Sequence, residues 1–333
     1  MGPMAERELI EQFDLFVEVL LTGHSPESGV PELAGLAAIA EELRGLWREE
    51  FRVQLLADLA RAAGSMPREE IMPTKATPEG FHSLTPYLIV ERASEFIDFL
   101  KAAFGAQEKF RVPAAGGGII HAQVWIDDSI LELADATEKF PPRPTAIHLY
   151  VPDVDETCRR AVEAGATLAY KVVDQEYGDR EGSVTDRFGN RWYDATHKSP
   201  GAVRGYLPPE LRAVTPYLHP LGSPGLIDFF RAAFGAEEAA RYEGPDGSIV
   251  HAKIRLGDSS LELSEARGPY QPMPAGLHYF VDDVDAVYHR AIEAGGVSIS
   301  EPADMPYGDR SAGVTDPAGN SWFIATHVRD VSF

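Results

Sequence analysis

The chain has 333 residues, of which 44% are hydrophobic, enough for two or three globular domains with a sizeable core. Its formal net charge of −22 argues against nucleic acid or an anionic membrane as a partner, because both require basic surfaces. No apolar run is long enough to span a bilayer and the N-terminus shows no signal-peptide pattern, so we expect a cytoplasmic protein.

The first predicted elements, within residues 1–64, are helices. Apolar residues recur at helical spacing between Leu9 and Leu20, and Pro31 stands at the start of a further helical stretch. Residues 65–82 are rich in proline, glycine and polar residues, which is typical of a linker. We expect the N-terminal segment to form a small helical bundle that carries no chemistry and docks on the rest of the chain or on a second copy.

A β-hairpin with two contrasting faces is predicted for residues 119–133. Period-two alternation around Asp127 and Asp128 indicates two strands that turn at these aspartates, with Gln123 opposite Glu132. One face is apolar and suited to packing under helices. The other face carries His121, Gln123, Trp125 and Glu132.

From residue 83 onward the chain is a tandem duplication. His251 follows His121, and His327 follows His197, by the same 130 positions, so no insertion separates the copies. The polar hairpin face returns in copy two as His251, Lys253, Arg255 and Glu262. We therefore expect a first domain at residues 83–200 and a second at 201–333.

Each copy contains a fainter internal doubling. A strand that ends at Val90 leads into a helix that stops at Gly105, and a strand that ends at Val151 leads into a helix that stops at Gly165. About three strands follow each helix. The body is therefore predicted to consist of four β-α-β-β-β units.

The ordered motifs of the two copies resemble the vicinal oxygen chelate superfamily, the glyoxalase and bleomycin-resistance group, and within it the PhnB-like branch. The residues that carry the resemblance are TPYL, IDFLKAAFGA, LEL, AVEAGA, YGDR and the closing GN, W and ATH, which recur in the same or similar form in both copies. The resemblance implies an α+β fold of two tandem glyoxalase-like domains, each of two βαβββ modules whose mixed sheets curl around a cavity with helices outside. It turns the polar hairpin faces toward that cavity, whereas an ordinary antiparallel sheet would expose them to solvent.

The resemblance also implies where a metal ion would be held. Metal-dependent relatives place one ligand on the first strand and a glutamate on the fourth strand of each module. The first-strand positions here hold Thr85, Ala146, Thr215 and Gly276, and the fourth-strand positions hold Glu132, Tyr193, Glu262 and Phe323. Of these eight positions only Glu132 and Glu262, one in each copy, hold a usual metal ligand. Transition-metal sites normally need three or more protein ligands, so we expect no conventional metal site and no cofactor. Three histidines and a glutamate on one concave surface leave a non-standard divalent metal site as an alternative. The single Cys158 excludes a thiol-ligated zinc site in a monomer, and its place in a predicted helix favours an inert thiol.

If strand parity follows the family, aromatic and polar side chains line the cavities, as in many small-molecule pockets. In copy one these expected ligand-binding residues are Tyr87, His121, Gln123, Trp125, Glu132, His148, Tyr150, Tyr193 and His197. In copy two they are Tyr217, His219, His251, Lys253, Arg255, Glu262, His278, Phe323 and His327. The cations Lys253 and Arg255 either orient an anionic ligand or form a cross-strand salt bridge with Glu262.

The motif Tyr-Gly-Asp-Arg begins at Tyr177 and recurs at Tyr307. A structural interpretation makes Asp179 and Arg180 an ion pair that pins a turn, with Gly178 supplying an unusual backbone angle. A functional interpretation has the tyrosine close the mouth of the cavity. We favour the structural one.

The resulting functional hypothesis is a binding protein that sequesters a partly aromatic or drug-like molecule. The alternative is a lyase, isomerase or dioxygenase that uses an altered His/Glu metal site or an acid–base pair, with His121, Glu132, His251 and Glu262 as candidate catalytic residues. A third hypothesis has ligand binding signal through the N-terminal helices. The duplication implies that one chain supplies both halves of what is a homodimer in shorter relatives, which favours a monomer. The N-terminal helices leave a homodimer as the alternative. In either case the expected partner is a small-molecule ligand.

Overall fold

The computed structural model describes residues 76–114, 116–198, 200 and 202–331. The predicted N-terminal helices and most of the predicted linker lie outside these described residues. Residues Pro73–Phe333 form one compact unit. Within the described part of the chain, no helix is both long and apolar enough to cross a lipid bilayer.

Four βαβββ modules follow one another along this unit, as the internal doubling predicts. The first comprises β1 (Leu84–Val90), α4 (Ala93–Phe104), β2 (Gln107–Pro113), β3 (Ile119–Ile126) and β4 (Ser129–Asp135). The second comprises β5 (Ala146–Tyr150), α5 (Val154–Glu163), β6 (Thr167–Asp174), β7 (Asp179–Thr185) and β8 (Arg191–His197). The third comprises β9 (Val214–Leu218), α6 (Ser223–Phe234), β10 (Glu237–Glu243), β11 (Ile249–Leu256) and β12 (Ser259–Leu263). The fourth comprises β13 (Gly276–Phe280), α7 (Val284–Glu293), β14 (Val297–Asp304), β15 (Asp309–Thr315) and β16 (Ser321–His327). The predicted α+β class and module order are confirmed.

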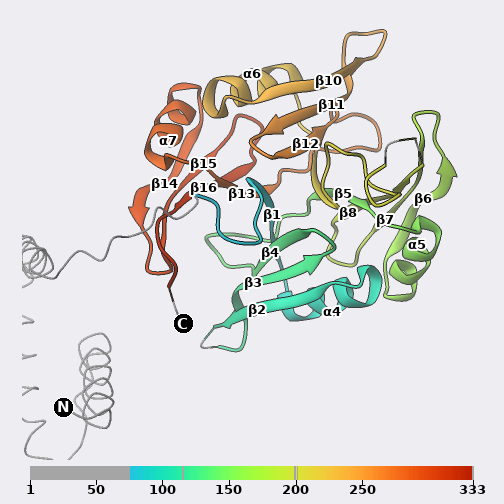
Figure 1. Ribbon diagram of the computed structural model, residues 1–333, viewed down its shortest axis with the longest axis horizontal. Helices are drawn as coiled ribbons and strands as arrows, with labels where there is room; N and C mark the ends of the chain where they lie inside the picture. The colour runs from blue at the N-terminus through green and yellow to red at the C-terminus, as the bar shows by residue number, and fades with distance from the viewer. Residues whose placement is uncertain (1–75, 115, 199, 201, 332–333) are drawn as a thin grey trace, which may run out of the picture. The chain divides into compact units, whose positions relative to one another are not determined.

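Each of the two eight-stranded sheets combines one module from each copy. The order β14-β15-β16-β13-β1-β4-β3-β2 joins the fourth module to the first, and the order β10-β11-β12-β9-β5-β8-β7-β6 joins the third to the second (Figure 1). The antiparallel pairs of β1 with β13 and of β5 with β9 form the two seams. Neither copy therefore completes a sheet by itself.

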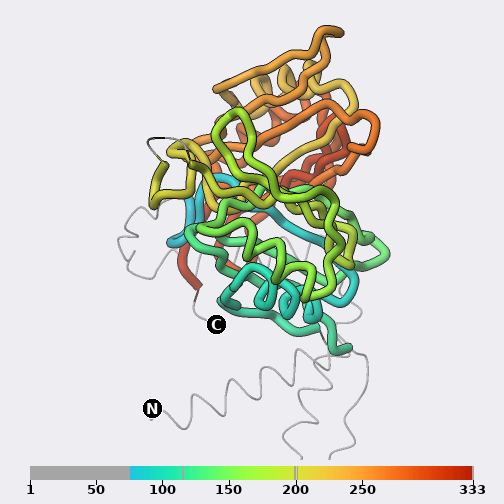
Figure 2. The backbone as a smooth tube through the Cα atoms, turned by 90° about the vertical axis from the view of Figure 1, so that its right-hand side faces the viewer, coloured from blue at the N-terminus to red at the C-terminus, as the bar shows by residue number. Residues whose placement is uncertain are grey.

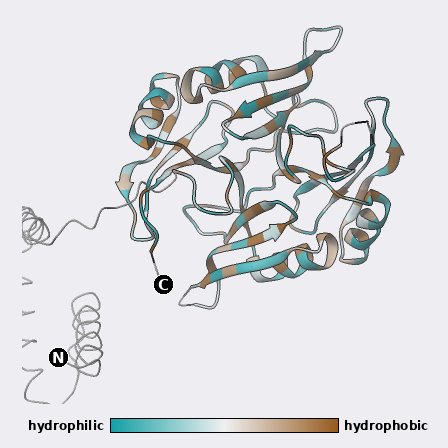
Figure 3. Cartoon of the chain, viewed as in Figure 1, coloured by the Kyte–Doolittle hydropathy of each residue, from teal (hydrophilic) through white to brown (hydrophobic). Residues whose placement is uncertain are grey.

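The hydrophobic cores, in contrast, follow the copies. One core contains apolar side chains from both modules of copy one together with Val214, and the other contains those of copy two together with Leu84. Helix α4 packs against α5, and α6 packs against α7, so each copy holds its two helices together (Figures 1 and 2). The helices contain both hydrophobic and hydrophilic residues, because each has one buried and one exposed face (Figure 3). We keep the domain division near residue 200 as a proposal, since the cores follow it and the sheets cross it.

The predicted hairpin is present in both copies. Gln123 pairs with Glu132 across β3 and β4, and Lys253 pairs with Glu262 across β11 and β12. The apolar face of the first hairpin is buried, including Val124, because it packs under the helical layer. Asp127 adopts a φ of 55° at the turn, a left-handed conformation that aspartate tolerates better than most residues.

Candidate functional site

The histidine-bearing faces of the two sheets form two candidate sites with the same plan. Site 1 belongs to the sheet of the first and fourth modules, and site 2 belongs to the sheet of the second and third modules. Site 1 contains Tyr87, His121, Gln123, Glu132, His278, Phe323 and His327. Site 2 contains His148, Tyr150, Tyr193, His197, Tyr217, His219, His251, Lys253 and Glu262.

A buried carboxylate occupies the centre of site 1. Glu132 accepts hydrogen bonds from His278 Nδ1 at 2.7 Å and from Gln123 Nε2 at 3.1 Å. The Nε2 atom of His121 lies 3.4 Å from Glu132 Oε1, the oxygen that also accepts from Gln123. Sequence reasoning paired Glu132 with His121 but did not predict that His278, from the other copy, makes the shorter contact.

Burial and charge shift the pKa values of His121 and His278 in opposite directions. Burial lowers the pKa of His121, and the charge of Glu132 only partly opposes this effect. Burial would also lower the pKa of His278, but the charge and hydrogen bond of Glu132 outweigh it and raise that pKa. Burial would raise the pKa of Glu132, but His278 reverses the effect and the net shift is downward. These shifts favour a charged His278–Glu132 pair beside a neutral His121.

Site 2 repeats this centre with residues from the opposite modules. His148 Nδ1 lies 2.6 Å from Glu262 Oε2, and His251 Nε2 lies 3.5 Å from Glu262 Oε1. Burial lowers the pKa of His251. For His148 burial would do the same, but the negative charges of Glu262, Glu181 and Asp179 together raise its pKa to about 9.

The two sites differ in the polarity of their aromatic side chains. In site 1 the Tyr87 ring packs against Phe323 at 5.3 Å and His121 at 5.7 Å between centroids, with Phe110 and Phe140 adjacent. In site 2 the Tyr217 ring packs against Tyr193 at 4.9 Å and His219 at 5.0 Å. Three phenylalanines in or next to site 1 have tyrosine equivalents in or next to site 2: Phe140 with Tyr270, Phe280 with Tyr150, and Phe323 with Tyr193. Site 1 is the more apolar of the two.

Some predicted site residues lie at the margin or have other partners. Arg255 is exposed and pairs with Glu237, and Trp125 packs near Lys109. Lys253 donates to Glu210 at 2.5 Å, so the suggested salt bridge with Glu262 is wrong about the partner, although the two residues face each other across the hairpin.

His219 is held in a neutral form within site 2. Its Nε2 lies 2.7 Å from the Tyr193 hydroxyl and its Nδ1 lies 3.0 Å from the Ser264 hydroxyl. Burial, assisted by the positive charge of Arg191, lowers the pKa of His219 to about 4. This imidazole is therefore a hydrogen-bonded part of the aromatic wall.

The Tyr-Gly-Asp-Arg motif does not contain the predicted ion pair. Asp179 contacts His197 Nδ1 at 2.5 Å and accepts from the Tyr150 hydroxyl at 3.0 Å, whereas Arg180 pairs with Asp155 and Asp174. Strand alternation explains the difference, because successive residues of β7 point to opposite faces of the sheet. The prediction for Gly178 is confirmed by its φ of 100°.

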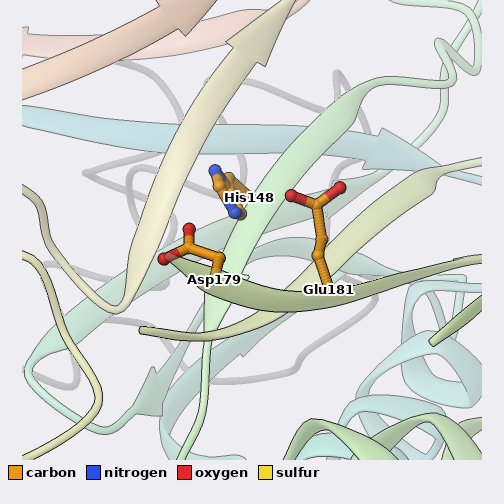
Figure 4. Close-up of side chains that lie close together, drawn as sticks. All are labelled: His148, Asp179 and Glu181. Carbon is orange, nitrogen blue, oxygen red and sulfur yellow. The ribbon is translucent and has the colours of Figure 1, made fainter. Parts of the chain in front are cut away.

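Sequence reasoning missed one cluster in site 2. His148, Asp179 and Glu181 each offer a ligand atom within 4.8 Å of the other two (Figure 4). Asp179 and Glu181 stand two positions apart on β7 and thus share a face, and that spacing is the sequence signal that could have revealed them.

The metal arrangement of metal-dependent relatives does not fit this chain. Each site retains one glutamate, Glu132 or Glu262, and in both sites it is already engaged by a histidine. At Gly276, one of the expected ligand positions, an added Cβ would lie 2.4 Å from the Tyr87 carbonyl oxygen, so no ligand side chain can be accommodated there. We derive no chemistry through that arrangement.

Comparisons with known proteins agree with the architecture. The family model described as Glyoxalase/Bleomycin resistance protein/Dioxygenase superfamily matches residues 80–193 and 224–324. An uncharacterised protein of Mycobacterium bovis is 39% identical over 121 residues, which cover 33% of this chain and 80% of that protein. Another M. bovis protein, provisionally described as a glyoxylase, is 26% identical over 219 residues, which cover 62% of this chain and 80% of that protein.

A solved structure shows the same fold. Glyoxalase I from Zea mays superimposes with a TM-score of 0.55 and 14% identity, covering 74% of this chain and 93% of that chain. The two segments matched by the family model lie in the two halves of the duplicated body, as the tandem repeat requires. The chain belongs to the glyoxalase, bleomycin-resistance and dioxygenase superfamily.

Proposed function

We propose that the protein binds a small, partly aromatic molecule at site 1. The observation that carries the proposal is the cluster of aromatic rings around His121. These rings stay partly open to solvent and lie next to the His278–Glu132 ion pair. Phe110 is 41% exposed, and Tyr87 and Phe323 are only partly buried. Apolar rings gathered at one open surface with a few fixed polar groups are typical of a ligand site.

The polar groups of site 1 support recognition of an acceptor on the ligand. The Tyr87 hydroxyl and His121 Nδ1 lie 3.2 Å apart, so either group can reorient toward a bound carbonyl or hydroxyl. A cavity of about 30 Å³ lies beside Tyr87 and Phe140 and has room for a water-sized group. The bleomycin-resistance part of the family description is consistent with a protein that sequesters its ligand.

Titration of the full chain with 8-anilinonaphthalene-1-sulfonate, a planar aromatic probe, tests this proposal. We expect one fluorescent site per chain, with an affinity that Phe323→Ala weakens at least tenfold. The matched control is Tyr193→Ala, which removes the equivalent ring from site 2 and should leave that affinity within twofold. Equal losses in both variants, or no binding by the folded wild-type chain, would contradict the proposal.

A second candidate function is acid–base catalysis at the same site. The observation in its favour is that His121 is neutral, has 26% of its side chain exposed and lies within 3.4 Å of a buried carboxylate. A neutral imidazole that a ligand can reach is a competent general base. The hemithioacetal of methylglyoxal and glutathione is the first substrate to assay, because a similar protein is provisionally described as a glyoxylase. Turnover that persists in His121→Asn would exclude His121 as the base.

A further inference from the structure

Site 2 contains a buried set of metal-ligand groups that site 1 lacks. His148 lies on β5, and Asp179 and Glu181 lie on β7. Their exposed fractions are 5%, 5% and 9%, and the three side chains converge in Figure 4. They are distinct from the first-strand and fourth-strand positions that hold metal in metal-dependent relatives.

The imidazole of His148 has one nitrogen engaged and one without a partner. Its Nδ1 pairs with Glu262 at 2.6 Å, whereas its Nε2 is buried and has no hydrogen-bond partner. An unsatisfied buried nitrogen is costly unless a ligand satisfies it. Metal-bound histidines are commonly oriented in this way: a carboxylate holds one nitrogen of the imidazole, and the metal binds the other nitrogen.

Both carboxylates of the cluster are held in place from outside it. Asp179 is fixed by His197 and the Tyr150 hydroxyl. Glu181 accepts from the Tyr170 hydroxyl and, at 2.7 Å, from the Tyr177 hydroxyl. Each carboxylate oxygen has two lone pairs, so these bonds leave acceptor capacity for a cation.

The charges in this region are unbalanced. Three buried carboxylates, Asp179, Glu181 and Glu262, surround the buried imidazole of His148, and the less buried His197 and His251 contact Asp179 and Glu262 respectively. Buried charge is stable only where it is paired, and a divalent cation would compensate the excess negative charge. The cluster lies close to the protein surface, because Tyr177, whose hydroxyl donates to Glu181, is 62% exposed.

The duplicated half supplies an internal comparison. Positions 130 residues later hold His278, Asp309 and Ser311, so the third carboxylate is absent from site 1. The hydroxyls of Tyr150 and Tyr170 are replaced there by Phe280 and Ser300. The third acidic group therefore occurs in one site only, together with Tyr150 and Tyr170, whereas Tyr177 has an equivalent in Tyr307 of site 1.

We propose that site 2 binds one divalent transition-metal ion through His148 Nε2, Asp179 and Glu181. Three protein ligands leave coordination positions for water or for a small molecule. One imidazole with two carboxylates suits Mn²⁺, Fe²⁺ or Zn²⁺ better than Ca²⁺, which prefers six to eight oxygen ligands. Glu262, the family's usual ligand, acts here as the group that orients His148.

Isothermal titration of the full chain, first freed of metal with a chelator, tests this assignment with Mn²⁺ and Zn²⁺. We expect one strong site per chain, tighter for Zn²⁺ than for Mn²⁺ and at least tenfold weaker for Ca²⁺. Glu181→Gln keeps the size of the side chain and should weaken Mn²⁺ binding at least tenfold. Asp309→Asn, in the equivalent strand of site 1, should change it less than twofold. No binding of Mn²⁺ or Zn²⁺ below about 1 mM, or equal effects of the two substitutions, would overturn the assignment.

A measurement on the wild-type chain avoids reliance on any variant that fails to fold. The electron spin-echo spectrum of bound Mn²⁺ should show modulation from one coordinated imidazole nitrogen. Affinity should also rise by up to tenfold per pH unit between pH 6 and 8, because the metal competes with a proton for His148. Bound Mn²⁺ without nitrogen modulation would place the ion elsewhere and sink the proposal.

Discussion

His278 Nδ1 lies 2.7 Å from Glu132 Oε2, although 146 residues separate the two along the chain. Strand β1 brings them together, because it pairs with β4, which carries Glu132, on one side and with β13, which carries His278, on the other. The same relationship joins His148 to Glu262 in site 2. Each site thus requires both copies, which explains how one duplicated chain can complete two sites.

Glu132→Gln is expected to destabilise the fold by about 3 kcal/mol, because it leaves the half-buried His278, whose pKa this carboxylate raises, without its counter-charge. Urea unfolding of the full chain measures this loss. The control is Glu95→Gln, which removes a carboxylate that forms exposed ion pairs with Arg92 and Arg187 and should cost at most about 1 kcal/mol. Similar losses in both variants would show that the buried pair has no special role in stability.

The His148–Glu262 pair predicts a stability that falls at alkaline pH. The pKa of His148 is raised from 6.5 to about 9 in the folded chain, so folding favours the protonated form. This contribution is fully present below pH 6.5 and is lost as the pH rises through 9. It amounts to about 3 kcal/mol between these limits.

Unfolding free energies of metal-free chain at pH 6, 7.5 and 9 test the prediction, with His148→Gln as the reference. The stability advantage of the wild-type chain over this variant should shrink across that range. A difference that is independent of pH would mean that His148 is neutral throughout.

Local patterns predicted much of the fold. Alternation along residues 119–133 gave both faces and the register of the first hairpin, since Gln123 does pair with Glu132. Glycine at the end of α4 marks its stop, with Gly105 in the left-handed conformation. These features depend on neighbouring residues and can therefore be predicted from one sequence.

The centres of the sites could not be predicted in the same way. The partner of Glu132 depends on which strand lies beyond β1, and no local pattern specifies that β13 from the other copy takes this place. The alternation that aims both Asp179 and Glu181 inward was readable, but its significance depends on His148 from a different strand. The pairing of distant strands was the missing information.

Cys158 is expected to be chemically inert in the folded chain. Burial, together with the negative charge of Asp194, raises the pKa of its thiol well above the usual value. The reactive species is the thiolate, so the native protein should not react with 5,5′-dithiobis-(2-nitrobenzoic acid) within an hour at pH 8. The unfolded chain in urea should release one equivalent of chromophore. Rapid reaction of the native chain would indicate an accessible thiol and contradict its buried placement.

Gly276→Ala is expected to destabilise the seam between the two copies. Gly276 lies at the start of β13, where a Cβ would stand 2.4 Å from the Tyr87 carbonyl oxygen on β1, and rigid backbone cannot yield cheaply. Forcing an extra methyl group into such a contact costs about 1 to 3 kcal/mol. The equivalent position on β5 already holds Ala146, so the requirement for glycine is particular to the β1–β13 seam.

The control for this substitution is Gly225→Ala within α6, where nothing lies within 4 Å of the added Cβ. Alanine favours the helical state over glycine by about 0.5 to 1 kcal/mol, so this variant should be slightly more stable than the wild-type chain. Thermal unfolding of the two variants beside the wild-type chain separates the effects by their opposite signs. A neutral Gly276→Ala would show that β1 and β13 can move apart without loss, and the close seam that brings His278 to Glu132 would then lose its support.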